Sequence, residues 1–117
     1  MNRGEFRRYF KTMGPVVLPV IHVHDEEQAK RNLAVAIRCG APGAFLINHD
    51  FEVSRFLPII EESRRAFPDF WLGVNFLGVT GKDAFPILGQ LAEKDVFVDA
   101  YWADDARIDE RVRQQAE

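Results

Sequence analysis

The chain has 117 residues, of which 47% are apolar and 28% charged, and its formal net charge is -3 at pH 7. This composition is typical of one globular domain, and the small negative charge argues against a broad basic surface for nucleic acid. No apolar run reaches the roughly 18 residues that a membrane span needs, and the charged N-terminus is unlike a secretory signal. Cys39 is the single cysteine, so an intrachain disulfide is excluded and a cytoplasmic location is expected.

The first elements expected along the chain are a short helix and a strand. Residues 1–14 space four apolar side chains as one face of an amphipathic helix, which we expect to cap one end of a sheet. Residues 16–23 are expected to form the first strand, in which Pro19 favours an edge position, a bulge or a late start. A helix over 25–39 follows, with acidic residues in its first turn and Gly40 at its end.

Three further strands are expected to alternate with helices. The second strand covers 43–48, and the helix after it begins near Asp50 and contains Pro58. The third strand lies in the stretch 70–78, which is apolar almost throughout and therefore reads as a strand covered on both faces. A helix beginning near residue 80 leads to a fourth strand over 96–102 and a polar helix from Ile108 to the end. The strands recur every 26 or 27 residues.

This repeat predicts right-handed β/α crossovers and a parallel sheet. Two architectures fit, a small doubly wound domain of flavodoxin type and four units of an eight-unit barrel. The even period and the absence of a fifth strand favour a parallel (βα)4 half-barrel, spanning 1–117 as a single domain. Because such a sheet leaves edges and an apolar face uncovered, we expect a homodimer or higher homo-oligomer.

Polar side chains are expected at the carboxyl ends of all four strands, where barrels of this kind place their chemistry. His22 and Asp99 are the candidate acid/base residues, and Asp99 is alternatively a structural partner of an arginine or a backbone N–H. The candidate substrate-binding residues are Asn48, Asp50, Asn75 and Trp102.

Each of these candidates also has a purely structural interpretation. The asparagines can satisfy loop backbone, Asp50 and the Asp104-Asp105 pair can cap helices, and Trp102 can belong to a core or an interface. His22 and His24 are two residues apart and so share one side of a strand, as a divalent-metal pair does in the amidohydrolase superfamily. Whether a metal or another cofactor is bound is left unknown.

Three segments resemble the BtpA/SgcQ family: Val20-Ile21-His22, the run 40–48, and the run 72–77, which contains Gly73-Val74-Asn75. The resemblance implies a (β/α)8-barrel fold, of which this chain is about half, and a link to photosystem I biogenesis in cyanobacteria or to poorly characterised enzymes. The matching positions are His22, Asn48 and Asn75. Ile47 stands where the family pattern has a glutamate, and Val23-His24-Asp25 replaces its proline- and glycine-rich loop.

Two functional hypotheses follow. In the first, a site at the strand carboxyl ends binds a small phosphorylated or nucleotide-like ligand. In the second, the chain is a non-catalytic assembly module whose apolar surface serves association. A metal-dependent hydrolase using the His22/His24 pair is a further alternative to the first.

Overall fold

The computed structural model describes residues 2–104 and residue 114. Its elements follow one another as α1 (Arg3–Tyr9), β1 (Val20–Val23), α2 (Glu26–Arg38), β2 (Gly43–Asn48), α3 (Val53–Ala66), β3 (Trp71–Phe76), α4 (Gly81–Ala92) and β4 (Ala100–Tyr101). All strand pairs are parallel, in the order β1-β2-β3-β4. The predicted parallel (βα)4 half-barrel is confirmed, and the sheet does not close.

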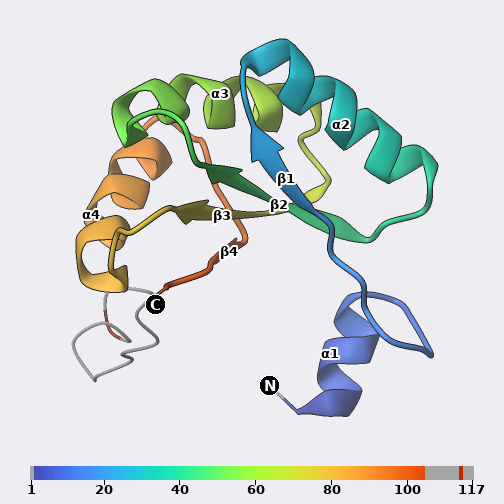
Figure 1. Cartoon of the computed structure of the whole chain (residues 1–117). Helices are drawn as coiled ribbons and strands as arrows, with labels where there is room; N and C mark the ends of the chain where they lie inside the picture. Colours follow the sequence, from blue (N-terminus) through green and yellow to red (C-terminus); the bar gives the residue numbers. More distant parts are fainter. Residues whose placement is uncertain (1, 105–113, 115–117) are drawn as a thin grey trace.

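The helices α2, α3 and α4 curve around one side of the sheet, whereas α1 lies apart from them on the other side (Figure 1). Side-chain caps account for the start of two of these helices, α2 and α4, whereas α3 begins after Glu52 with no side-chain cap. Asp25 caps α2 by accepting the N–H of Gln28 at 2.8 Å, and Thr80 caps α4. Gly40 ends the turn after α2 with φ +83°, a conformation that glycine adopts without strain.

Several predicted boundaries are wrong. The first strand begins at Val20 rather than at residue 16, and it lies at the edge of the sheet, so Pro19 is associated with both a late start and an edge position. The helix α3 has Glu52 as its N-cap residue rather than Asp50, and it continues through Pro58. The fourth strand is confined to Ala100–Tyr101 instead of 96–102. The predicted helix from Ile108 and the second residue of the Asp104-Asp105 pair lie outside the described residues.

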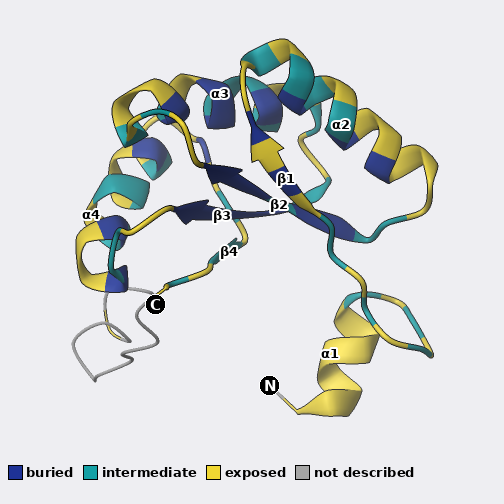
Figure 2. Cartoon of the chain, in the orientation of Figure 1, coloured by how far each residue is buried: buried dark blue, intermediate teal, exposed yellow. Residues whose placement is uncertain are grey.

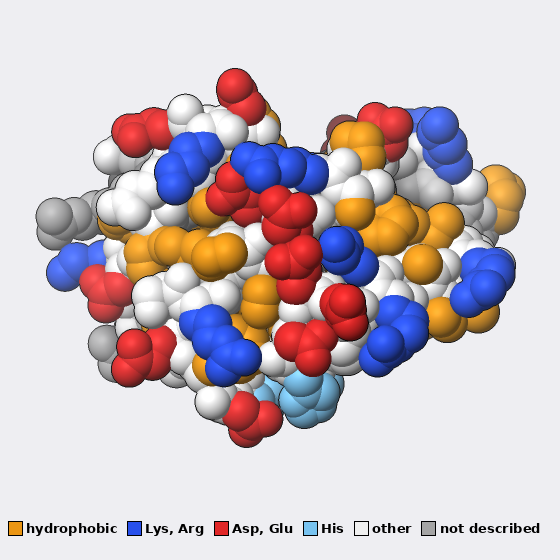
Figure 3. All heavy atoms as spheres, turned by 90° about the horizontal axis from the view of Figure 1, so that it is seen from above, with side chains coloured by type: hydrophobic (Ala, Val, Ile, Leu, Met, Phe, Trp, Pro, Cys, Tyr) orange, Lys and Arg blue, Asp and Glu red, His pale blue; other side chains and the backbone are white. Residues whose placement is uncertain are grey.

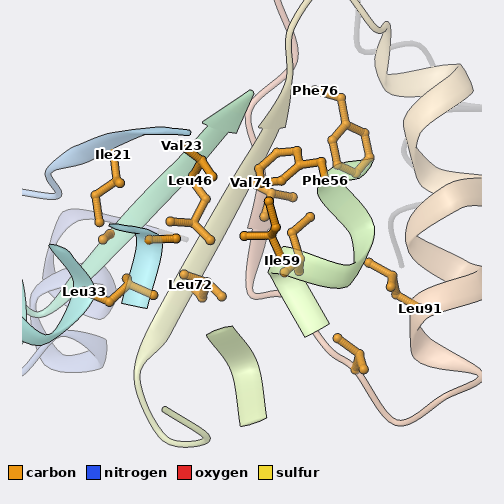
Figure 4. Packing of buried hydrophobic residues seen from close by; sticks show 14 of the residues in the cluster. Ile21, Val23, Leu33, Leu46, Phe56, Ile59, Leu72, Val74, Phe76 and Leu91 are labelled. Carbon is orange, nitrogen blue, oxygen red and sulfur yellow. The ribbon is translucent and has the colours of Figure 1, made fainter. Parts of the chain in front are cut away.

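The core lies between the sheet and the three outer helices. Strand residues that alternate along β1, β2 and β3 point into it. Figure 2 shows where buried positions fall along the strands and helices, and Figure 4 shows the buried side chains of the strands together with those of α2, α3 and α4. Phe56 of α3 is fully buried and packs edge-to-face on Phe76 of β3, with ring centroids 5.9 Å apart. The strand members of this core are Ile21, Val23, Ala44, Leu46, Leu72, Val74 and Phe76.

The strand side chains that alternate with these, among them His22, Phe45, Ile47 and Asn75, form the opposite surface, called here the open face. Phe45 lies on this face with edge-to-face contacts to Trp71 at 5.3 Å and to Trp102 at 5.8 Å between ring centroids. Phe10, just after α1, contacts Trp71 in the same manner at 5.5 Å. The aromatic rings therefore run in a chain from the N-terminal segment across the sheet.

In the described part of the chain no helix has the length and apolar character to cross a membrane.

The close contact of Phe45 with Gly73 provides a test of this packing. A Cβ atom built at Gly73 would lie 2.3 Å from Cε1 of Phe45, so the ring would have to move. We expect Gly73→Ala to lower the free energy of unfolding by about 1–3 kcal/mol in urea denaturation, because overpacking forces side chains from their preferred positions.

The matched control is Gly89→Ala in α4, where an added Cβ meets nothing within 4 Å. This change is expected to raise stability by up to about 1 kcal/mol, because alanine is the better helix former. Equal effects of the two substitutions would contradict the packing described for Phe45.

Candidate functional site

One row of side chains crosses the open face at its carboxyl end. The register places His22 opposite Ile47 and Ile47 opposite Asn75. Tyr101 pairs with Val74, so Trp102 follows next to Asn75. We call these four residues, His22, Ile47, Asn75 and Trp102, the rim row. With strands about 4.8 Å apart, His22 and Asn75 are about 10 Å from each other, a span that a small ligand can bridge.

Asn75 is the polar centre of the rim row and is only 1% exposed. Its Nδ2 donates to the carbonyl of Trp102 at 2.6 Å and to Oδ1 of Asp104 at 3.1 Å. The second oxygen of Asp104 accepts the N–H of Gly78 at 3.0 Å. The Oδ1 atom of Asn75 is buried and has no hydrogen-bond partner among the described residues.

His22 and His49 form a stacked pair at the β1 end of this row. Their ring centroids are 4.5 Å apart with 24° between the ring planes, and both residues are exposed. All three histidines of the chain belong to this corner, where Figure 3 shows histidine side chains together at the surface. His49 was not predicted as a site residue. The strand register indicates that His49 lies near His22, because His22 pairs with Ile47 and His49 is two residues after Ile47.

The predicted metal pair has no support from the contacts of its members. His24 approaches Asp50, with Nδ1 3.8 Å from Oδ2, while His22 stacks on His49. Over residues 2–104 and 114 there is no group of three histidine, cysteine, aspartate or glutamate side chains that could hold a metal ion. Asp50 is thus a neighbour of His24 rather than a helix cap, and no contact links it to Asn75.

The backbone of the first strand is held by Gln28 of α2. Its side-chain oxygen accepts the N–H of His24 at 2.9 Å, and its Nε2 donates to the carbonyl of His22 at 3.1 Å. The amide thus binds one backbone donor and one backbone acceptor, as a neighbouring strand would. Gln28 thereby fixes the end of β1 that carries the imidazole of His22.

Asn48 lies on the other face of the sheet from Asn75. It is 4% exposed and alternates with Ile47, so its side chain is on the helix side. Its Nδ2 donates to the carbonyl of Phe51 at 2.8 Å, and its Oδ1 accepts the N–H of Leu77 at 3.0 Å. These bonds join the loops that follow β2 and β3, which is the structural alternative that the sequence left open. The predicted convergence of Asn48 with His22 and Asn75 is wrong.

The predicted position of Asp99 at the carboxyl end of its strand is also wrong. Asp99 precedes β4 and lies level with Leu72, three residues before Asn75 along the sheet, a distance of about 10 Å. Its Oδ2 accepts the N–H of Leu72 at 2.8 Å and an N–H of Arg64 at 2.9 Å. Asp99 thus makes the contacts of its structural interpretation, with both an arginine and a backbone N–H.

A hollow of about 700 Å³ opens at this amino end and is lined by Arg64, Asp99, Trp71 and Phe10 among others. Arg64 is committed to the protein, because it also donates to the carbonyls of Phe67, Pro68, Phe70 and Phe97. The neighbouring Arg65 pairs with Glu61 and Glu62. Arg64, Arg65 and Asp99 are thus held by other groups of the protein, while Lys11, Asp69 and Asp95 also line the hollow. The hollow lies at the amino end of the strands, whereas parallel α/β folds bind ligands at the carboxyl end, so the rim row remains the better candidate site.

No family model, curated protein or solved structure matches the chain. The candidate site therefore stands on its own geometry.

The Arg64–Asp99 contact predicts a stability effect at the amino end. Asp99→Ala removes the acceptor of two hydrogen bonds and leaves the guanidinium of Arg64, whose side chain is 13% exposed, without its carboxylate. We expect the free energy of unfolding to fall by about 1–3 kcal/mol, measured by urea denaturation. The control is Asp69→Ala, which removes an exposed carboxylate at the same end and should change stability by less than about 0.5 kcal/mol. A loss no greater than that of the control would show that the Arg64–Asp99 contact contributes nothing.

Proposed function

We propose that the chain is a half-barrel of the BtpA/SgcQ type that binds a small phosphorylated or nucleotide-like ligand at the rim row. Asn75 orients the ligand in this proposal, and His22 supplies the acid/base group, since imidazole is the side chain most often used for proton transfer. His49 joins His22 through the stacked contact of their rings. Asp99 and Asn48 act in holding the sheet and its loops rather than in binding the ligand.

The observation that carries this proposal is the buried Oδ1 atom of Asn75. Leaving a buried acceptor without a hydrogen bond costs about 1–3 kcal/mol, and native proteins leave few such groups without a purpose. This group lies at the carboxyl end of a central parallel strand, the end at which parallel α/β folds bind ligands. A ligand that satisfied Oδ1 would recover that free energy on binding.

Calorimetry with adenosine 5′-monophosphate and ribose 5-phosphate tests the proposal. We expect His22→Ala and Asn75→Ala each to weaken binding by about tenfold, the equivalent of one hydrogen bond of about 1.4 kcal/mol. The control is Asp69→Ala at the opposite end of the sheet, which should bind as the unchanged chain does. Unchanged affinity in both rim variants would refute the site.

A second candidate function, assembly with another copy of the chain, is favoured by the open face. Parallel sheets are normally covered on both faces, yet here Trp102 is 48% exposed and Val20 is 38% exposed. The aromatic surface around Phe45 carries no charged side chain on the strands, so two such faces can meet without burying unpaired charge. A two-fold pair of half-barrels would cover both open faces at once.

Sedimentation velocity at micromolar concentration measures this association. We expect the chain to dimerise and Trp102→Asp to weaken dimerisation by at least about tenfold, because a carboxylate would be buried in the interface. The control is Val17→Asp, which changes a side chain that is 71% exposed and precedes β1. A chain that is strictly monomeric at this concentration would contradict the assembly proposal.

A further inference from the structure

The orientation of the Asn75 amide is fixed by its surroundings. Its nitrogen end faces two groups that only accept hydrogen bonds, the carbonyl of Trp102 and the carboxylate of Asp104. Turning the amide over would place its oxygen against both acceptors and lose both bonds. The end without a partner is therefore the oxygen, and it points away from β4.

This orientation determines what kind of group can bind there. An amide oxygen accepts hydrogen bonds and donates none, so it needs a hydroxyl or an N–H opposite it. A fully ionised phosphoryl or sulfuryl group offers only oxygens with lone pairs and would be repelled. Because the oxygen is sealed from solvent, the arriving group must be small and must displace little of the protein.

We propose that Asn75 Oδ1 selects a ligand through a hydroxyl or amino group on a ring, such as the sugar or base of a nucleoside. This inference rests on the proposed function and names the part of the ligand that reaches Asn75. Trp102, the neighbour of Asn75 in the rim row, supports a ring, because its half-exposed indole offers an apolar surface for stacking. Any phosphate of the ligand lies away from Asn75.

The side-chain carbonyl carbon of Asn75 reports directly on this hydrogen bond. The chain has four asparagines, so selective ¹³C labelling gives four side-chain carbonyl signals, each assigned by one substitution. The probes are D-ribose and adenosine, which carry donors, and sulfate, which carries none. The internal control is Asn48, because both ends of its amide are bonded within the chain.

We expect the Asn75 carbonyl signal to move downfield with ribose or adenosine and to stay in place with sulfate, while the Asn48 signal does not move. A shift with sulfate alone would overturn the donor inference and leave the ligand site standing. No shift with any probe would overturn the site itself.

The isosteric Asn75→Leu variant gives a second measurement. It removes the acceptor, and adenosine binding should weaken by at least about tenfold. If the variant does not fold, the labelled unchanged chain still decides the question. If the variant folds and binds adenosine as before, the inference is wrong.

Discussion

Parallel pairing in a single register is the constraint on which the rest of this structure depends. Because the strands run the same way and their side chains alternate, the face and the end to which each residue belongs follow from its position in the strand. A shift of one residue in β3 would turn Asn75 toward the helices and bring Val74 onto the open face. The core and the rim row are thus two consequences of one pairing.

Polar side chains hold the two ends of the sheet where that pairing stops. At the amino end Asp99 ties the start of β4 to Leu72 and to Arg64 at the end of α3. At the carboxyl end Asn48 and Asp104 bind backbone N–H groups of the loop that follows β3. In each case a side chain accepts a backbone N–H at the end of the sheet, which a buried or half-buried backbone requires.

The sequence predicted the central strands well and the outer ones poorly. The stretches that became β2 and β3 are apolar on both faces, and this pattern is specific for a covered parallel strand. The apolar residues Val96, Phe97 and Val98 also suggested a paired strand. In the structure Val96 is instead buried beside the end of α4, and Phe97 is 59% exposed. Apolar character indicates burial, and whether a buried segment pairs depends on its partners.

The sequence located the end of the sheet at which the candidate site lies, but not the face of the sheet on which each side chain stands. Reading the strand ends located His22, Asn75 and Trp102, whereas Asn48, the same residue type at the end of its own strand, stands one register position beyond Asn75 and faces the other way. Their opposite faces follow from the alternation with Leu46 and Val74, which only the observed core assigns. His49 was missed for the same reason, since its nearness to His22 depends on the pairing of β1 with β2.

Ligand binding and assembly share Trp102 but otherwise concern different parts of the open face, and they are physically linked. A small ligand covers the rim row, whereas Phe45 and Trp71 lie nearer the amino end and need a larger partner to cover them. A second half-barrel seated on those rings would also exclude water from the rim row. Hydrogen bonds strengthen as the local dielectric falls, so a bond to Oδ1 of Asn75 would be stronger in the assembled form. By linkage, a ligand bound at the rim would then favour association.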